Sequence, residues 1–188
     1  MLRHVEEYAK YVEITGFRNV KIEDAEEFLR AICKEKQQNT VVQFFNAELV
    51  ATWEHLYFAV LNALTAFRNK SNISRNVAME IILYASAQRQ IRKAIALVGV
   101  KRDSANIAIV TIGENPDSVK TTLHTVSKRI GAKPDETVLE LSKGKVRSIR
   151  RAFDISEKEL KTVMKKGDAQ QALVNLVVER AALLSTQL

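Results

Sequence analysis

The sequence predicts an α/β protein: a single domain with a small mixed or antiparallel sheet covered by helices, including a long central helix pair and an apolar C-terminal helix. Short segments rich in β-branched residues alternate with longer segments that have helical spacing of apolar residues. Pro occurs only twice, and no repeat or low-complexity linker divides residues 1–188. A chain of 188 residues can bury a sizeable core without disulfides or metal, and its single cysteine, Cys33, cannot form an internal disulfide.

The first elements alternate between strand and helix. KYVEITGF, residues 10–17, alternates apolar and polar side chains and predicts a strand that ends at Gly16. Asp24 is the expected N-cap of a helix over 25–34, and TVVQFF, residues 40–45, predicts a second strand. Connections this short make a mixed or antiparallel sheet more favourable than a parallel one, although the order alone leaves the pairing open.

A pair of long helices is expected next. Thr52 is a candidate cap for a helix over 53–67, and a second helix is expected over 77–98 with Gly99 just past its end. The first helix carries an apolar stripe that we expect to be buried, formed by Trp53, Tyr57, Val60, Leu61, Leu64 and Phe67.

The second half of the chain has clear helix punctuation. Asn115 followed by Pro116 predicts a helix start, and Ser156 with Glu159 forms a capping-box pattern. The segment ETVLEL, residues 136–141, is ambiguous between a strand and the start of a helix. The remaining expected elements are a strand over 106–113 and helices over 115–131, 143–153, 155–160 and 169–184.

The basic charge is concentrated in one stretch of the chain. Between His55 and Arg102 there are eight basic residues and one acidic residue, Glu80, so this segment carries +7, the formal charge of the whole chain. Such asymmetry indicates an anionic partner, with nucleic acid the usual one, or alternatively two helices with solvated outer faces. The basic residues are Arg68, Lys70, Arg75, Arg89, Arg92, Lys93, Lys101 and Arg102.

No motif points to catalysis, a metal or a cofactor. The three histidines have no ligand-spaced partner, and there is no phosphate-binding glycine motif. Cys33, His55 and Asn62 could be assembled into a nucleophile set, but a cysteine inside an amphipathic helix is ordinarily structural. The N-terminus has no signal-peptide pattern and no apolar run could span a bilayer, so we expect a cytoplasmic protein. The residues give no positive evidence for an enzyme, although acid–base pairs can come from anywhere in a fold.

The turn FRNKSNISRN, residues 67–76, has two interpretations. Asn72, Ser74 or Asn76 could cap the following helix, whose N-terminal N–H groups, together with the nearby cations, could hold a phosphate. Alternatively, the Asn and Ser side chains simply supply the caps that every helix needs.

Two helix faces also leave alternatives open. His55, Ala59, Asn62 and Ala66 share one face, which is either a shallow groove for bases and ribose or a close packing contact. The last helix is apolar over almost its whole circumference, so its second apolar side meets either a partner or the protein's own core.

Residues 42–100 resemble a known family. The matching positions are His55, Ala59, Asn62-Ala63, Ala66-Phe67, Asn72-Ile73, Glu80, Tyr84, Arg89-Gln90-Ile91, Ala94-Ile95 and Gly99. With the later FDISEKEL and the apolar last helix, this set resembles the kinase-binding subunit of the KEOPS complex, the Cgi/PRPK-binding protein family. Family members often have Gly in the turn before Asn72, where this chain has Lys70-Ser71.

The resemblance implies a non-catalytic subunit, of archaeal origin. KEOPS makes threonylcarbamoyladenosine in tRNA. The family's subunit binds the single-stranded 3′ CCA end of tRNA and docks on the kinase-like ATPase, and through it reaches the threonylcarbamoyl-transferring subunit. The alternative is a protein-only regulator of that ATPase, without RNA binding of its own. The expected tRNA-binding residues are His55, Asn62, Arg68, Lys70, Asn72, Arg75, Arg89 and Gln90, and those of the kinase-subunit interface are Val174, Val177, Val178 and Leu184.

Overall fold

The computed structural model describes residues 2–165 and 167–186, and its fold is α/β with a four-stranded antiparallel sheet. The chain divides into two compact units. The sheet unit consists of Met1–Ala47 and Val100–Val138, and the helical unit of Glu48–Gly99 and Leu139–Leu188. The expected fold class is confirmed, and the expectation of one domain over 1–188 stays a prediction.

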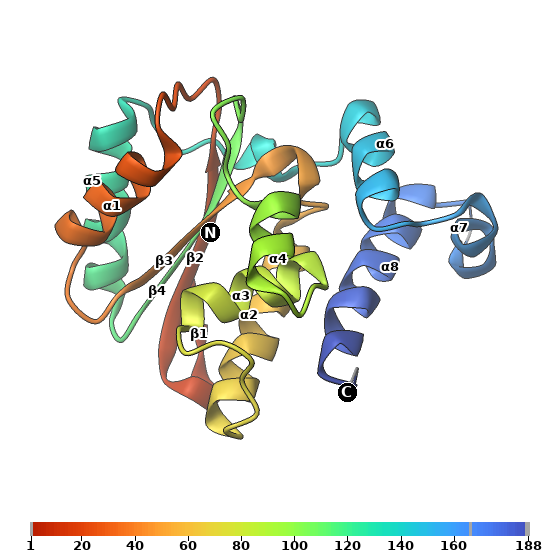
Figure 1. Ribbon diagram of the computed structural model, residues 1–188, viewed down its shortest axis with the longest axis horizontal. Helices are drawn as coiled ribbons and strands as arrows, with labels where there is room; N and C mark the ends of the chain where they lie inside the picture. Colours follow the sequence, from red (N-terminus) through yellow and green to blue (C-terminus); the bar gives the residue numbers. More distant parts are fainter. Residues whose placement is uncertain (1, 166, 187–188) are drawn as a thin grey trace. The chain divides into compact units, whose positions relative to one another are not determined.

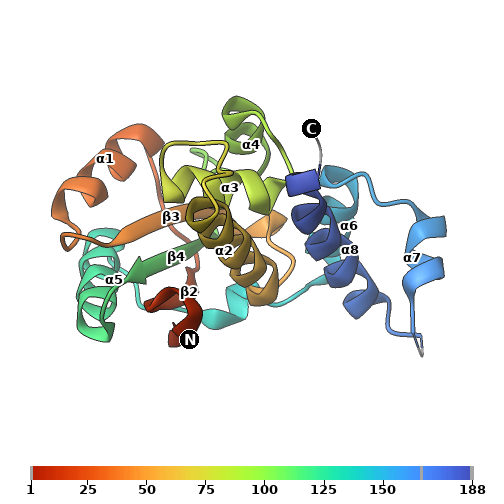
Figure 2. The same cartoon turned by 90° about the horizontal axis from the view of Figure 1, so that it is seen from below.

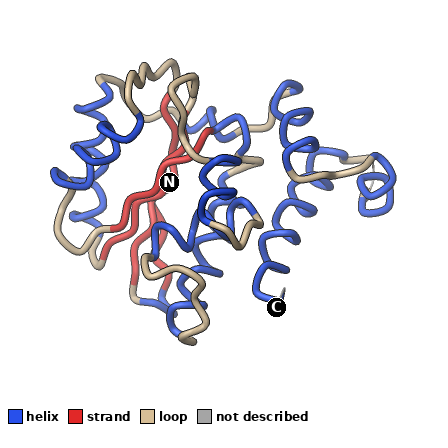
Figure 3. Tube along the Cα trace, viewed as in Figure 1, coloured by secondary structure: helices blue, strands red, loops and turns tan. Residues whose placement is uncertain are grey.

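The sheet unit contains every strand among the described residues. They are β1 Leu2–Val5, β2 Lys10–Phe17, β3 Val41–Asn46 and β4 Ile107–Gly113. The strands form one sheet, drawn in red in Figure 3. They lie in the order β1-β2-β4-β3, and all three pairings are antiparallel, which decides the open question of pairing. Sequence analysis missed β1, which has only four residues and exposes two of them.

Two helices cover one face of this sheet. They are α1 Ala25–Glu35 and α5 Pro116–Ile130, which pack against each other beside the strands (Figure 1). Their inner side chains join those of the sheet in one core that includes Phe17, Ile32, Phe44, Ile109 and Val126.

The expected N-caps are present in both helices of the sheet unit. The Asp24 carboxylate accepts hydrogen bonds from the first-turn N–H groups of α1, and the Asn115 side chain accepts one at the start of α5. Gly131 ends α5 in the left-handed conformation, with φ 73°, which glycine adopts without steric cost. Both helix starts and this helix end therefore follow from local sequence.

The helical unit is built around three mutually packed helices, α2, α3 and α8. The helix α4 packs on α3, and α6 and α7 flank α8 (Figure 2). The bounds are α2 Trp53–Arg68, α3 Val77–Ser86, α4 Ile91–Val98, α6 Lys143–Ala152, α7 Glu157–Val163 and α8 Ala169–Leu183.

The expectation of one helix over 77–98 is wrong. The chain leaves the helix at Ala87, which is left-handed with φ 52°, and restarts as α4 at Ile91. At the break, the Ala87 N–H donates to Tyr84 O and the Gln88 N–H donates to Leu83 O, so the last carbonyls of α3 are satisfied. No Gly or Pro occurs at this position, so the helical spacing of apolar residues predicted one continuous helix.

Two further expectations are corrected. Residues 136–139 form a short 3-10 turn, so the ambiguous segment begins neither a strand nor an α-helix. On α2, Val60 and Leu64 are buried as expected, whereas Trp53, Tyr57, Leu61 and Phe67 are only partly covered. The most buried residues of α2 also include His55, Leu56, Ala59, Ala63 and Ala66. The alanines allow close helix–helix approach, which places this narrow face inside the unit.

Candidate nucleic-acid and partner surfaces

The turn between α2 and α3 already holds a negative charge of the protein's own. Glu80, in the first turns of α3, is fully buried. Its carboxylate accepts hydrogen bonds from the N–H groups of Ile73, at 3.0 Å, and Ser74, at 2.7 Å. The Asn76 side chain caps α3 by accepting from Ala78 N–H. These contacts occupy two N–H groups of the turn and one at the start of α3 that a bound phosphate could otherwise use.

The predicted binding residues of this turn lie mostly at the surface. Arg68, Lys70 and Arg75 are exposed, whereas Asn72 is half-buried and its side-chain amide donates to Ser74 O. Lys70 is left-handed, with φ 57°, a conformation that Gly adopts without steric cost and that is uncommon for Lys. We refer to Arg68, Lys70 and Arg75 as the turn group.

A second cluster of polar and basic residues lies at the break between α3 and α4. Arg89, Gln90, Arg92 and Lys93 are all exposed, and the sequence has no acidic residue from Ala85 to Lys101. A guanidinium nitrogen of Arg89 donates to Leu184 O at 3.4 Å, which ties the break to the end of α8. We refer to these four residues as the break group.

The structure therefore separates the predicted tRNA-binding residues into two sets. The turn group precedes the first residue of α3, and the break group follows its last residue. A ten-residue helix is about 15 Å long, so the two groups lie at opposite ends of α3.

The two remaining predicted residues, on α2, differ in exposure. Asn62 is half-buried, and its side-chain amide donates to Phe58 O. His55 is completely buried, with its ring edge-on to Phe153. A direct RNA contact through His55 would require the helical unit to open.

His55 is held as a neutral imidazole. The Ala51 N–H donates to Nδ1 at 3.3 Å, so Nε2 carries the proton and donates to Ala85 O at 2.8 Å. Burial lowers the pKa of His55 from 6.5 to about 4, against the hydrogen bond to Ala85 and with a smaller contribution from the Lys145 charge. Its evident role is to join α2 to the end of α3 just before the helix breaks.

A hollow of about 380 Å³ lies beside the break. Its lining comes from the break itself, from the end of α6 and from α8: Ser86, Ala87, Gln88, Ala152, Phe153, Asp154, Arg180 and Leu183. Sequence analysis missed this hollow because the lining segments are distant in the chain.

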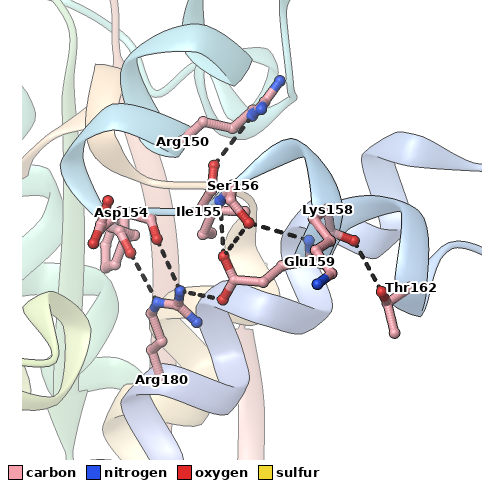
Figure 4. Close-up of polar contacts among 9 residues, drawn as sticks. Arg150, Asp154, Ile155, Ser156, Lys158, Glu159, Thr162 and Arg180 are labelled. Atoms are coloured by element: carbon pink, nitrogen blue, oxygen red, sulfur yellow. Dashed lines mark hydrogen bonds and ion pairs between the residues drawn. The ribbon is translucent and has the colours of Figure 1, made fainter.

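Arg180 lines the hollow and makes several hydrogen bonds. Figure 4 shows these polar contacts. The Arg180 guanidinium donates to the carbonyls of Phe153 and Asp154 and to the Glu159 carboxylate, at 2.8, 3.0 and 2.8 Å. The same carboxylate completes the expected capping box with Ser156. The hydrogen bond from Arg180, followed by those from Ser156, lowers the pKa of Glu159 from 4.5 to about 2. The capping box was visible in the sequence, but its link to Arg180 was not.

The predicted kinase-subunit interface is largely internal. Val174, Val177 and Leu184 are buried within the helical unit, and Val178 is half-buried. The apolar residue of α8 that is well exposed is Leu183, at 47%, next to the exposed Ala182. The all-round apolar pattern of α8 therefore reflects its position among α2, α3, α6 and α7.

Neither a metal-binding cluster of His, Cys, Asp and Glu nor a helix fit to cross a membrane occurs within residues 2–165 and 167–186.

The chain is a small α/β protein with an exposed basic region and an exposed apolar helix end. The sequence model of the family described as "Kinase binding protein CGI-121" matches residues 17–185, and the chain belongs to this family. The chain is also similar to the "Regulatory protein Cgi121" of Methanocaldococcus jannaschii. The two are 35% identical over 113 residues, which cover 60% of this chain and 70% of that protein. The resemblance noted over residues 42–100 is thereby confirmed at the level of the family.

Proposed function

We propose that this protein is a non-catalytic, cytoplasmic subunit of the KEOPS complex that binds the single-stranded 3′ CCA end of tRNA and docks on the kinase-like ATPase. The observation that carries the RNA part is the break group: exposed basic side chains, in a stretch without acidic residues, beside a hollow. The family description supports the kinase-like partner.

The break group fits single-stranded RNA in charge and chemistry. Arg89, Arg92 and Lys93 supply cations for phosphates, and the Gln90 amide can donate to and accept from a base edge. The neighbouring hollow, at about 380 Å³, lies in the size range of small-ligand sites and can receive a base or ribose. The turn group adds longer-range attraction. In this proposal, His55 and Asn72 support the backbone beneath these surfaces, and Asn62 is a peripheral contact.

The docking surface for the ATPase is assigned to the exposed end of α8. Val178, Ala182 and Leu183 replace the buried valines and Leu184 as the contacting side chains, since they have surface to offer a partner. Through the kinase-like ATPase, the protein would be linked to the threonylcarbamoyl-transferring subunit of the complex.

The test of the RNA part compares tRNA with an intact and a trimmed CCA end. We expect affinity to fall at least tenfold on trimming, and the Arg92→Glu/Lys93→Glu variant, which leaves the contact of Arg89 with the end of α8 intact, to lose a similar factor for intact tRNA. The matched variant Arg68→Glu/Arg75→Glu reverses the same number of charges in the turn group and should have a smaller effect. Equal affinity for intact and trimmed tRNA would show that the end is not captured.

Docking is measured separately with the kinase-like ATPase. Ala182→Glu, at an exposed position that does not line the hollow, should weaken docking, whereas both double charge reversals should leave it unchanged. A protein that docks and changes ATPase activity but shows no affinity for tRNA would be the protein-only regulator, and the RNA part of the proposal would be wrong.

A further inference from the structure

A second basic surface lies on the sheet unit, outside the segment that carries the formal net charge. Residues 120–133 contain three lysines, one arginine and His124, and no acidic residue. The acidic residues elsewhere balance this charge in the sum over the chain, but they are not interspersed with it. We name Lys120, His124, Lys128 and Lys133 the α5 basic face.

The fold turns this face outward. The opposite side of α5 buries Val119, Thr122 and Val126 in the sheet unit. Lys120, His124 and Lys128 follow one another at four-residue steps, about 6 Å apart along the helix axis, and all three are exposed. Lys133, just beyond the helix end, is exposed as well.

The charges of this face are not compensated within the protein. Four other basic residues of the sheet unit have carboxylate partners: Lys10 with Glu114, Arg18 with Asp135, Arg30 with Glu26, and Arg129 with Glu35. Among the described residues, Lys120, Lys128 and Lys133 make no ion pair or side-chain hydrogen bond. Segregated, unpaired cations on one helix face attract an extended anion.

A concavity accompanies the charge. A hollow of about 630 Å³ is lined by Glu35, His124, Thr125, Lys128 and Arg129. Its single carboxylate, that of Glu35, is paired with Arg129 at 3.0 Å. Lys128 and His124 are therefore the groups of the lining that an anion in the hollow would meet.

We propose that the α5 basic face binds the phosphate backbone of folded RNA, as a second contact for the body of the tRNA whose 3′ end the helical unit binds. The face has lysines, which are typical phosphate partners, and residues 120–133 contain no Phe, Tyr or Trp on which bases could stack. The contact is therefore one of charge and position, independent of base sequence. The choice of tRNA rests on the proposed function; the phosphate chemistry does not.

The test uses the full chain with Lys120→Glu/Lys128→Glu. The matched control is Lys158→Glu/Lys161→Glu, which makes the same charge change at exposed positions of α7 in the helical unit. Each variant is titrated with full-length tRNA and with a short single strand ending in CCA, at several salt concentrations, and its thermal unfolding is recorded.

For the α5 variant we expect at least tenfold weaker binding of full-length tRNA at low salt, and a salt slope smaller by about 2. Its affinity for the short strand should change less than about twofold, and the α7 control should bind both RNAs like the unaltered protein. If the α5 variant unfolds at a lower temperature, Lys120→Gln/Lys128→Gln replaces it, and a similar change in salt slope is expected because this variant also loses both phosphate contacts.

Three outcomes would overturn the inference. One is unchanged tRNA binding by the α5 variant, and another is an equal loss in the α7 control, which would indicate net charge alone. The third is lost docking to the kinase-like ATPase with tRNA binding intact, which would make the face a site for an acidic protein. Equal binding of trimmed and intact tRNA would refute end capture alone, because the α5 comparison can be made with either RNA.

Discussion

Glu80 and His55 show that polar residues deep in the helical unit fix its local geometry. The Glu80 carboxylate fastens the turn before α3 through two backbone N–H groups, and the His55 imidazole fastens the other end of α3 through Ala85. A buried polar group without partners is costly, so each of these residues constrains the chain that surrounds it. Both residues are among the positions that match the family, and in this structure both have structural roles.

Replacement of Glu80 by Gln should destabilise the protein. The amide can accept only one of the two hydrogen bonds with its oxygen and offers an NH₂ group to the other donor, so about 1–3 kcal/mol of unfolding free energy should be lost. Urea unfolding measures the loss. The control is Glu179→Gln on the exposed side of α8, which should change stability by less than about 0.5 kcal/mol. An equal effect of both substitutions would contradict the buried contact.

His55 should make the protein sensitive to mild acid. Its folded-state pKa of about 4 lies below its usual 6.5, so the folded state disfavours the protonated imidazole. The contribution of His55 to stability is complete above pH 6.5 and decreases as pH falls toward 4, with a total loss of up to about 3 kcal/mol.

The pH effect can be measured in two ways. In His55→Gln, the decrease of unfolding free energy between pH 6.5 and 4 should be smaller than in the unaltered protein by this amount. In the unaltered protein, an NMR titration of the imidazole should have its midpoint near pH 4. A midpoint at 6.5 would show that the ring is accessible to solvent.

At the scale of elements, the break between α3 and α4 is the feature that organises the candidate RNA surface. It exposes Arg89 and Gln90 at a helix junction, and its residues Ala87 and Gln88 line the hollow. An uninterrupted helix over 77–98 would distribute these side chains around its circumference instead. The break is held by main-chain hydrogen bonds and by a left-handed alanine.

Glycine at position 87 should stabilise the protein. The left-handed conformation costs a non-glycine residue such as Ala87 about 1–2 kcal/mol, and Gly avoids this cost. Part of the gain is offset because Gly also increases the conformational entropy of the unfolded chain. We expect Ala87→Gly to raise the unfolding free energy by about 0.5–1 kcal/mol. Ala96→Gly, in the exposed interior of α4, should lower it by a similar amount. A loss of stability in both variants would mean that Ala87 is not left-handed in solution.

At the scale of the whole molecule, each unit is assembled from two separate segments of the chain. The helical unit takes its α2–α4 helices from residues 48–99 and its α6–α8 helices from the C-terminal segment, and the two sets pack through α8. The sheet unit likewise needs β4 from its second segment, because β4 pairs with both β2 and β3.

A fragment of residues 1–99 should therefore fail to fold. Without β4, strand β3 has no neighbour and only the β1–β2 pair remains, while α2 and α3 lose α8. In urea, the circular-dichroism signal of the fragment should show no cooperative unfolding transition, whereas that of the full chain should. A fragment that has a β-sheet circular-dichroism signal and unfolds cooperatively would contradict this account.

The sequence by itself determined those features that depend on residues a few positions apart. It located most helices and three of the four strands. It identified the caps at Asp24, Asn115 and Ser156, the charge between His55 and Arg102, and the resemblance to the family that the comparison confirmed. A cap or an amphipathic period is local, so it can be read without knowing where the chain goes next.

Only the tertiary structure decided which of these features face solvent. The turn with the basic residues holds Glu80, the apolar last helix is an internal one, and the narrow face of α2 is packed. The α5 basic face was hidden in a balanced sum of charges, and the break at Ala87 has no Gly or Pro to announce it. Burial, ion pairing and hydrogen-bond partners are set by residues distant in the chain, so a local pattern cannot distinguish a surface from a core contact.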